Sequence, residues 1–240
     1  MVSRVKTEIK GLDNLLQGGL PKGSITMVTG GPGTGKSILC QQIVYNNAMN
    51  GLKCLYASFE QPEKNIVTQM KQFGFDPNKT KGKLKILSLN LSNPGVVDYF
   101  LEEFNKGHFN LVVIDSVASL YINPIPSTNK QMKMVEISEG VSPVPVEESS
   151  LKKLEIREII NPMQENDTTV LMINQTTKDS EYSRDEVSEY LCDGIMVLHT
   201  VEGEEGFRTV TIPKMRLTKQ KSGIYSFQIG KKGIEVKIEN

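Results

Sequence analysis

This sequence of 240 residues has little of what marks several classes of protein. Its three cysteines, Cys40, Cys54 and Cys192, stand singly among apolar residues and match neither a disulfide framework nor a Cys-x-x-Cys metal pattern. Its two histidines, His108 and His199, belong to no ligand-like group of residues. We therefore expect buried thiols in a reducing compartment and no zinc site.

The chain also lacks an excess of charge and a long apolar run. Its 28 Lys and Arg residues balance 28 Asp and Glu residues, so no global positive field indicates nucleic-acid binding, although a local basic patch can suffice. No apolar run reaches the ~18 residues of a membrane span, and the first residues do not begin a signal peptide. These absences favour a cytoplasmic protein without a membrane anchor.

What the chain does have is a phosphate-binding loop. The run Gly30-Gly31-Pro32-Gly33-Thr34-Gly35-Lys36-Ser37 fits the pattern G-x-x-x-x-G-K-[S/T] at every fixed position. The glycines let successive N–H groups point at phosphate oxygens, and the N-terminus of the following helix favours anions. Lys36 adds a charge at the β- and γ-phosphates, and the Ser37 hydroxyl can bind Mg²⁺. We predict that these residues and Ile38 bind a nucleoside triphosphate.

Strands and helices alternate along most of the chain. Apolar runs predict strands at 24–29, 53–59, 84–87, 110–115, 168–174 and 194–199, and periodicity predicts helices at 36–49, 62–72 and 95–105. This alternation predicts an α/β fold with a mostly parallel central sheet flanked by helices. The strand-like stretches 208–215, 225–229 and 234–238 have no helix between them, so we expect an antiparallel C-terminal edge.

One segment, residues 122–150, interrupts this pattern. It contains four prolines, a Ser-Thr-Asn cluster and little periodicity. Loops of this length are usually functional or disordered, so the segment is either a mobile surface insertion or a specific contact element. We expect residues 1–240 to form one domain that carries this insertion.

Two carboxylates follow strands that we expect to end near the phosphate loop. Asp115 ends an apolar run, and a carboxylate there can hold Mg²⁺ opposite Ser37. Glu60 follows another strand, and the carboxyl ends of parallel strands meet at the ligand crevice. A carboxylate there can orient and deprotonate an attacking water, although it can also cap the helix that follows. We predict Ser37 and Asp115 as magnesium ligands, and Glu60 and Lys36 as catalytic residues.

Three further polar residues are candidates for contacts with the nucleotide. We also predict a catalytic role for Gln175, which follows the strand at 168–174, because an amide there can hydrogen-bond the γ-phosphate or the attacking water and sense its loss; the alternative is a turn residue. Lys214 and Arg216 are two positions apart on an expected strand, which places both side chains on one face. Two such cations are ordinarily solvated, but beside an ATPase core they can stabilise charge on a neighbouring subunit's nucleotide.

Together these residues resemble the KaiC-like branch of the RecA superfamily of ATPases. The similar motifs are the lead-in from Gly11-Leu12-Asp13 to Gly23, the element Phe59-Glu60-Gln61-Pro62, the strand end Ile114-Asp115-Ser116-Val117 and the stretch 187–218. The likeness covers nearly the whole chain apart from residues 122–150. The chain resembles a single KaiC-type domain. It also resembles paralogues of RadA.

The resemblance implies a RecA-type P-loop core that binds ATP with Mg²⁺ at a subunit interface of a ring, commonly a hexamer. It makes Glu60 the catalytic carboxylate, and it makes Lys214 and Arg216 trans-acting cations. The chain departs from KaiC at Glu60-Gln61, where KaiC has two adjacent glutamates, which bears on the rate of hydrolysis. KaiC is also a tandem of two such domains, so we do not predict clock-type autokinase activity for this chain.

Three functions are compatible with these features. The first is a slow KaiC-like regulatory ATPase that forms a ring and switches a protein partner according to its nucleotide. The second is a DNA-binding recombination or repair accessory ATPase of the RadA-paralogue type. The third is a weakly hydrolysing scaffold in which ATP joins the subunits.

The charges of two loops disfavour DNA as a partner. In RecA-like rings the loops after the strands that correspond to 110–115 and 168–174 grip DNA, but residues 122–150 have two Lys against four Glu. Residues 176–189 have one Lys and one Arg against five acidic residues. Because Lys and Arg supply most non-specific affinity for phosphates, these loops do not suit DNA; a basic cluster within residues 214–232 keeps the alternative open.

Overall fold

A computed structural model describes residues 2–122, 132–137, 140–145, 148–176, 182–183, 188–201, 207–219 and 223–237. Its centre is a nine-stranded sheet made of β3 (Ile25–Gly30), β4 (Cys54–Ser58), β5 (Leu84–Ser88), β6 (Leu111–Asp115), β9 (Thr169–Ile173), β10 (Gly194–Thr200), β11 (Arg208–Met215), β12 (Ile224–Gly230) and β13 (Gly233–Val236). The strands lie in the order β13-β12-β11-β10-β3-β9-β6-β4-β5. The strand at the centre of this order, β3, leads directly into the phosphate loop.

The sheet is parallel from β5 to β10 and antiparallel from β10 to β13. Every residue of β3, β4, β6 and β9 is buried. Strands buried on both faces read as continuous apolar runs, which is why the sequence revealed them. The predicted α/β fold class, with its antiparallel C-terminal edge, is therefore confirmed.

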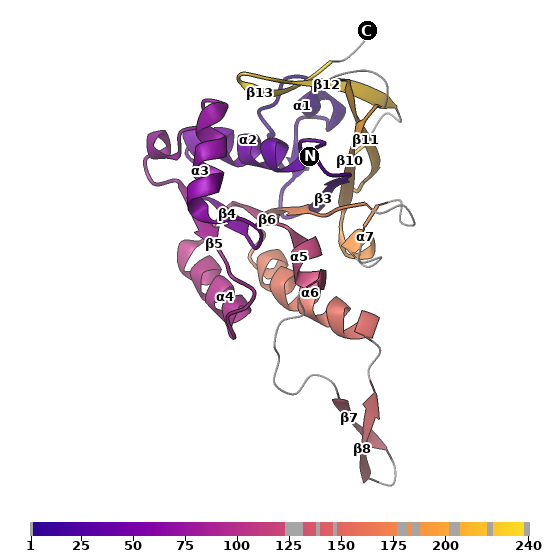
Figure 1. The fold of residues 1–240 in the computed structure, drawn as a ribbon. Coiled ribbons are helices and arrows are strands. Elements are labelled where there is room, and N and C mark those ends of the chain that lie inside the picture. The colour runs from indigo at the N-terminus through magenta and orange to yellow at the C-terminus, as the bar shows by residue number, and fades with distance from the viewer. Residues whose placement is uncertain are drawn as a thin grey trace.

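Helices cover both faces of the sheet (Figure 1). They are α1 (Leu12–Leu15), α2 (Lys36–Met49), α3 (Glu63–Gln72), α4 (Val96–Gly107), α5 (Val117–Ile122), α6 (Glu148–Glu165) and α7 (Ser188–Leu191), with a 3₁₀ helix, η1 (Pro77–Thr80). Two apolar clusters lie on opposite faces: Tyr56 of β4 packs in the cluster that contains α2, and its neighbours Leu55 and Ala57 pack in the one that contains α4 and α6. Successive side chains of a strand point to opposite faces, so each buried strand contributes to both clusters.

The N-terminal residues form a short antiparallel pair outside the main sheet. Its strands are β1 (Arg4–Val5) and β2 (Leu20–Pro21). From Pro21 the chain turns into β3, with the Ser24 hydroxyl donating to the Pro21 carbonyl at 2.6 Å. This pair therefore brings the chain to the start of the strand that carries the phosphate loop.

The segment 122–150 contains elements that the sequence analysis did not predict. Met132–Ile137 (β7) and Gly140–Pro145 (β8) form an antiparallel hairpin, and α6 begins at Glu148 and continues beyond the segment. The hairpin is a sheet of its own and projects away from the main body in Figure 1. The mobility expected for this segment stays a prediction.

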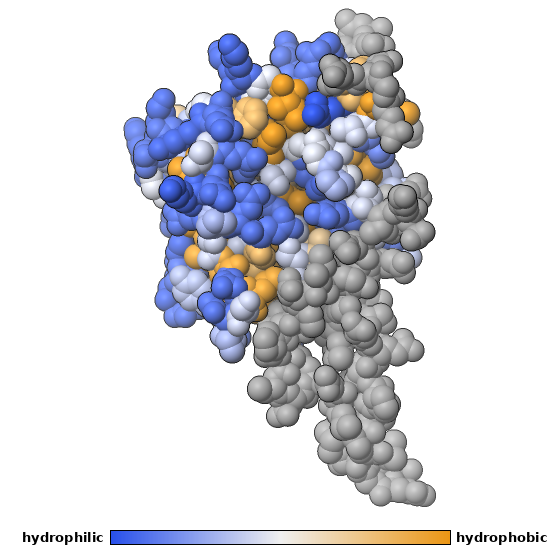
Figure 2. Space-filling view, viewed as in Figure 1, coloured by the Kyte–Doolittle hydropathy of each residue, from blue (hydrophilic) through white to orange (hydrophobic). Residues whose placement is uncertain are grey.

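The three cysteines are all buried, as predicted. On the face drawn in Figure 2 the described surface is mainly hydrophilic, and its apolar residues gather in small patches. Within the described ranges, no helix is long and apolar enough to cross a membrane.

Candidate nucleotide-binding site

The phosphate loop connects the end of β3 to the start of α2. Gly30 has a φ of 141°, and a Cβ added there would lie 2.1 Å from the Leu198 carbonyl oxygen, so only glycine fits. Gly33 also has a positive φ, of 74°, but a Cβ added there would meet nothing within 4 Å. The loop is therefore open at Gly33, in front of the N-terminus of the 14-residue helix α2. This shape suits an anionic ligand, because the first N–H groups of a helix attract phosphates.

Lys36 lies against the loop, with its side chain buried. Its Nζ donates to the carbonyl oxygens of Gly30, at 2.9 Å, and Gly31, at 2.8 Å. Burial lowers the pKa of Lys36 below its ordinary value, while the negative charges of Asp115 and Glu60 act in the opposite direction. A phosphate is a stronger acceptor for an ammonium group than these carbonyls are. Lys36 therefore lies where a nucleotide's terminal phosphates can replace the carbonyls.

Asp115 ends β6 beside the loop and is only 3% exposed. The Tyr56 hydroxyl donates to its Oδ2, and the Ser37 side chain lies near its carboxyl group. The pKa of Asp115 is raised to about 6: burial is the largest cause and the Glu60 charge adds to it, whereas the interactions with Tyr56, Ser37 and Lys36 act in the opposite direction. The two predicted metal ligands, Ser37 and Asp115, thus lie close together. A hydroxyl and a carboxylate oxygen are the hard ligands that Mg²⁺ takes, so these residues fit the ion.

Glu60 follows β4, the strand that pairs with β6. The residue is exposed, but its Oε1 accepts hydrogen bonds from the hydroxyls of Ser116 and of Ser119, the latter at 2.8 Å. The two serine oxygens are 3.2 Å apart. Both serines follow Asp115 in the chain, so the carboxylate of Glu60 is held beside the end of β6.

Tyr56 and Ser119 were not predicted as site residues. The register of β4 and β6 pairs Ser58 with Asp115, and this pairing brings Tyr56 and the residues after Asp115 to the loop. No motif marks either residue in the sequence. Only the adjacency of two strands far apart in the chain identifies them.

Gln175 follows β9 at its carboxyl end, as the phosphate loop follows β3 and Asp115 ends β6. Its N–H donates to the side-chain oxygen of Asn174 at 2.8 Å, and the N–H of Asn174 donates to the Val28 carbonyl at 3.0 Å. The N–H of Thr176 bonds the Gly30 carbonyl at 3.4 Å, so this strand end lies beside the phosphate loop. The role of the Gln175 amide as a sensor stays a prediction.

Lys214 and Arg216 lie at the amino-terminal ends of the parallel strands, whereas the phosphate loop lies at the carboxyl ends. The register pairs Lys214 and Met215 of β11 with the start of β10, and Gly194 of β10 pairs with Thr26 near the start of β3. The loop leaves β3 at its other end. At ~3.3 Å per residue, the backbone of Arg216 is about 15 Å or more from its own phosphate loop along the strand direction. The register thus separates Arg216 from the phosphate loop of its own chain.

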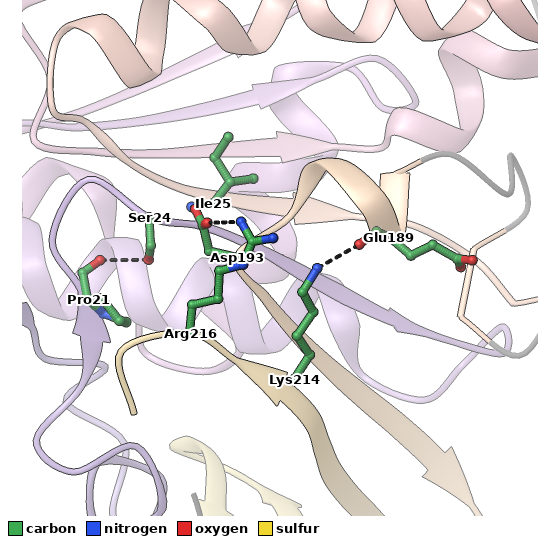
Figure 3. Close-up of polar contacts among 7 residues, drawn as sticks. All are labelled: Pro21, Ser24, Ile25, Glu189, Asp193, Lys214 and Arg216. Atoms are coloured by element: carbon green, nitrogen blue, oxygen red, sulfur yellow. Dashed lines mark hydrogen bonds and ion pairs between the residues drawn. The ribbon is translucent and has the colours of Figure 1, made fainter. Parts of the chain in front are cut away.

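Figure 3 shows how both cations are held. The Nζ of Lys214 donates to the Glu189 carbonyl oxygen at 3.0 Å. Nη1 of Arg216 pairs with Oδ1 of Asp193 at 3.1 Å, although the Arg216 side chain is 62% exposed. Both side chains point toward the segment that precedes β10, although Lys214 lies within β11 and Arg216 lies just beyond its end.

Comparisons with known proteins show what this chain is similar to. A family model described as "ATPase: KaiC" matches residues 5–240. The chain belongs to the KaiC family of ATPases. Its fold is the RecA-type P-loop core that the motifs implied, and a nucleotide is the ligand that membership of this family assigns to the loop.

Relatives of this KaiC-family chain include proteins of its own length and longer ones. A UPF0273 protein of Aeropyrum pernix is 27% identical over 98% of this chain and 94% of its own. The circadian clock oscillator protein KaiC of Parathermosynechococcus lividus is 28% identical over 98% of this chain, which spans only 42% of that protein. A crystal structure of a KaiC-like protein from Pyrococcus horikoshii matches with a TM-score of 0.79 and 27% identity, covering 99% of this chain and 100% of that one.

Proposed function

We propose that this protein is a slow ATP-hydrolysing regulatory ATPase, which assembles into a ring and changes state with its bound nucleotide. The proposal rests on one observation: the phosphate-binding residues lie at the carboxyl ends of the parallel strands, and the cations Lys214 and Arg216 lie at the opposite ends. Two copies that complete such a site meet head to tail, and head-to-tail contacts close into rings when the rotation permits. The KaiC-like resemblance favours six subunits.

The residues around the loop support hydrolysis as the reaction. The loop N–H groups and Lys36 hold the phosphates of ATP, and Ser37 and Asp115 would hold Mg²⁺, which offsets phosphate charge when bound. Glu60 orients a water in line with the γ-phosphorus and accepts its proton. The Gln175 amide detects the γ-phosphate. Because Gln61 stands where a second carboxylate would assist Glu60, we propose that turnover is slow.

Lys214 and Arg216 of one subunit complete the site of the next. The developing charge on the transferred phosphoryl group is the target that an arginine of a neighbouring subunit stabilises. In this arrangement, nucleotide binding contributes to assembly, since the phosphates lie between two subunits. The partner that reads the state of the ring is a protein rather than DNA, given the acidic loops.

Two measurements on the purified protein test this function: ATP turnover with and without single-stranded DNA, and mass in solution with and without ATP. We expect turnover that is slow and indifferent to DNA, from a ring that requires ATP. Turnover stimulated by DNA would instead support the repair alternative. A ring that forms with ATP but does not hydrolyse it would support the scaffold.

A further inference from the structure

Asp193 joins Arg216 to the strand that carries the phosphate loop. It precedes β10, and its N–H donates to the Ile25 carbonyl at 2.8 Å. Its Oδ2 accepts the N–H of the same residue at 3.0 Å. Ile25 is the first residue of β3, whose last residue opens the phosphate loop. The carboxylate is therefore fixed by the backbone of a central, fully buried strand.

The other carboxylate oxygen of Asp193 faces Arg216 (Figure 3). Oδ1 accepts from Nη1 at 3.1 Å, and the N–H of Arg216 donates to the Asp193 carbonyl at 2.9 Å. The two side chains are 62% and 24% exposed, for Arg216 and Asp193 respectively. A partly exposed ion pair contributes little to folding stability. The pair is therefore better suited to orienting the guanidinium than to stabilising the fold.

The chain that follows Arg216 is held as well. Arg4 donates to the Leu217 carbonyl at 2.7 Å, to the Thr218 hydroxyl at 3.0 Å and to the Gly19 carbonyl at 3.0 Å. With the backbone fixed on both sides, the remaining freedom of Arg216 is in its long side chain. Asp193 is the group that restrains it.

We propose that Asp193 is a positioning residue for Arg216, which holds the guanidinium toward the γ-phosphate bound by the neighbouring subunit. This inference rests on the trans role of Arg216 in the proposed function. A guanidinium has five N–H donors in a planar fork, so one bond to a carboxylate leaves others for phosphate oxygens. Holding that fork in place before the reaction removes part of the entropy cost of reaching the transition state.

The substitution Asp193→Asn tests the proposal, because it keeps the size and one oxygen but removes the charge. We expect kcat for ATP to fall about 10-fold, while KM, the affinity for a fluorescent ATP analogue and the mass of the ring stay unchanged. The matched control is Asp167→Asn: Asp167 pairs with Lys22 at 2.6 Å, near the same edge of the sheet, and has no proposed role in the site. The control should turn over ATP like the wild type.

Mixed assemblies separate positioning from a general defect in folding. Subunits with Glu60→Gln are expected to bind ATP and assemble without hydrolysing it, yet they present an intact pair of Asp193 and Arg216. With these subunits in excess, turnover per Asp193→Asn subunit should rise toward the wild-type value, even if that variant has a lower melting temperature. A misfolded subunit would not recover in this way.

Four outcomes would overturn the inference or its basis. Unchanged turnover in Asp193→Asn would show that the carboxylate does not position Arg216, and faster turnover would show that it restrains the arginine instead. If Arg216→Ala turns over ATP like the wild type, the trans role itself fails. If Arg216→Ala is slow while Asp193→Asn is not, only the role of Asp193 fails.

Discussion

The side chain of Glu60 is exposed, and one of its carboxylate oxygens accepts hydrogen bonds from two serine hydroxyls. This arrangement suits a general base, since the carboxylate is accessible to water but fixed in direction. It also separates binding from chemistry, because the phosphates are held by the loop and Lys36. A change at Glu60 should therefore affect the reaction and leave nucleotide affinity intact.

Replacing Glu60 by Gln should cut the kcat for ATP by at least ~100-fold, because an amide cannot accept the proton of the attacking water. Binding of a fluorescent ATP analogue should stay within error of the wild type. Both are measured on the same preparation, by phosphate release and by titration. Full activity in this variant would transfer the role of base to another residue.

Ser119 should act through Glu60. We expect Ser119→Ala to lower kcat by about 5-fold with an unchanged KM, because a carboxylate that loses one of two hydroxyl partners samples more orientations. Ser119→Thr keeps the hydroxyl and should retain most of the activity. Ser92→Ala, in an exposed loop, is the matched control. If Ser119→Ala and Ser119→Thr are equally impaired, the effect comes from packing around α5 and not from the hydroxyl.

Among single residues, the sequence predicted those that belong to motifs. Lys36 and Ser37 are specified by spacing alone, and Asp115 and Glu60 by their places at the ends of apolar runs. Tyr56 could not be predicted, because its contact with Asp115 depends on which strands are neighbours. The same holds for Asp193, which reaches Ile25 only because β10 pairs with β3.

At the scale of elements, the buried strands and the helices α2 and α3 were predictable because their patterns are strong. The helix α6 was missed although Ile156, Ile159, Ile160 and Met163 are buried at helical spacing. Pro162 lies inside this helix, and an interior proline ordinarily argues against one. The hairpin of β7 and β8 was missed because proline-containing strands are confined to sheet edges, and a two-stranded sheet consists of edges only.

The hairpin makes a prediction of its own. Replacing residues 123–147 by a Gly-Ser linker of about ten residues should preserve the fold, because the hairpin is a separate two-stranded sheet and such linkers are flexible. We expect the affinity for the ATP analogue to be unchanged and the melting temperature to shift by at most a few degrees. Loss of nucleotide binding would mean that the segment supports the phosphate loop.

The variant without residues 123–147 also tests whether this segment is a surface insertion or an element that makes a specific contact. If the insertion serves only as surface, the mass of the ATP-bound ring is that of the wild type after correction for the deleted residues. A ring that no longer forms would identify the hairpin as a contact between subunits. An intact ring with altered turnover would point to α5, since this helix carries Ser119 and leads directly into the segment.

At the scale of the whole molecule, the arrangement of the sheet decides what one chain can do alone. The phosphate loop leaves β3 at one edge, and Arg216 follows β11 at the other. The distance between them is too great for an arginine side chain to cover. Under the proposed function, a single chain therefore presents half of a site at each end of these strands, and an assembly completes the two halves.

Mixing two inactive variants tests this division of the site. Arg216→Ala subunits keep their own loop and Glu60, and Glu60→Gln subunits keep Arg216, so each lacks what the other supplies. In a random ring with equal amounts of both, one subunit in two carries the intact base, and half of these have a neighbour with the arginine. Turnover per subunit should therefore recover to about a quarter of the wild-type value. If turnover stays at the mean of the two separate variants, Arg216 acts within its own chain or takes no part in the reaction. Native mass spectrometry of the mixture verifies that mixed rings have formed.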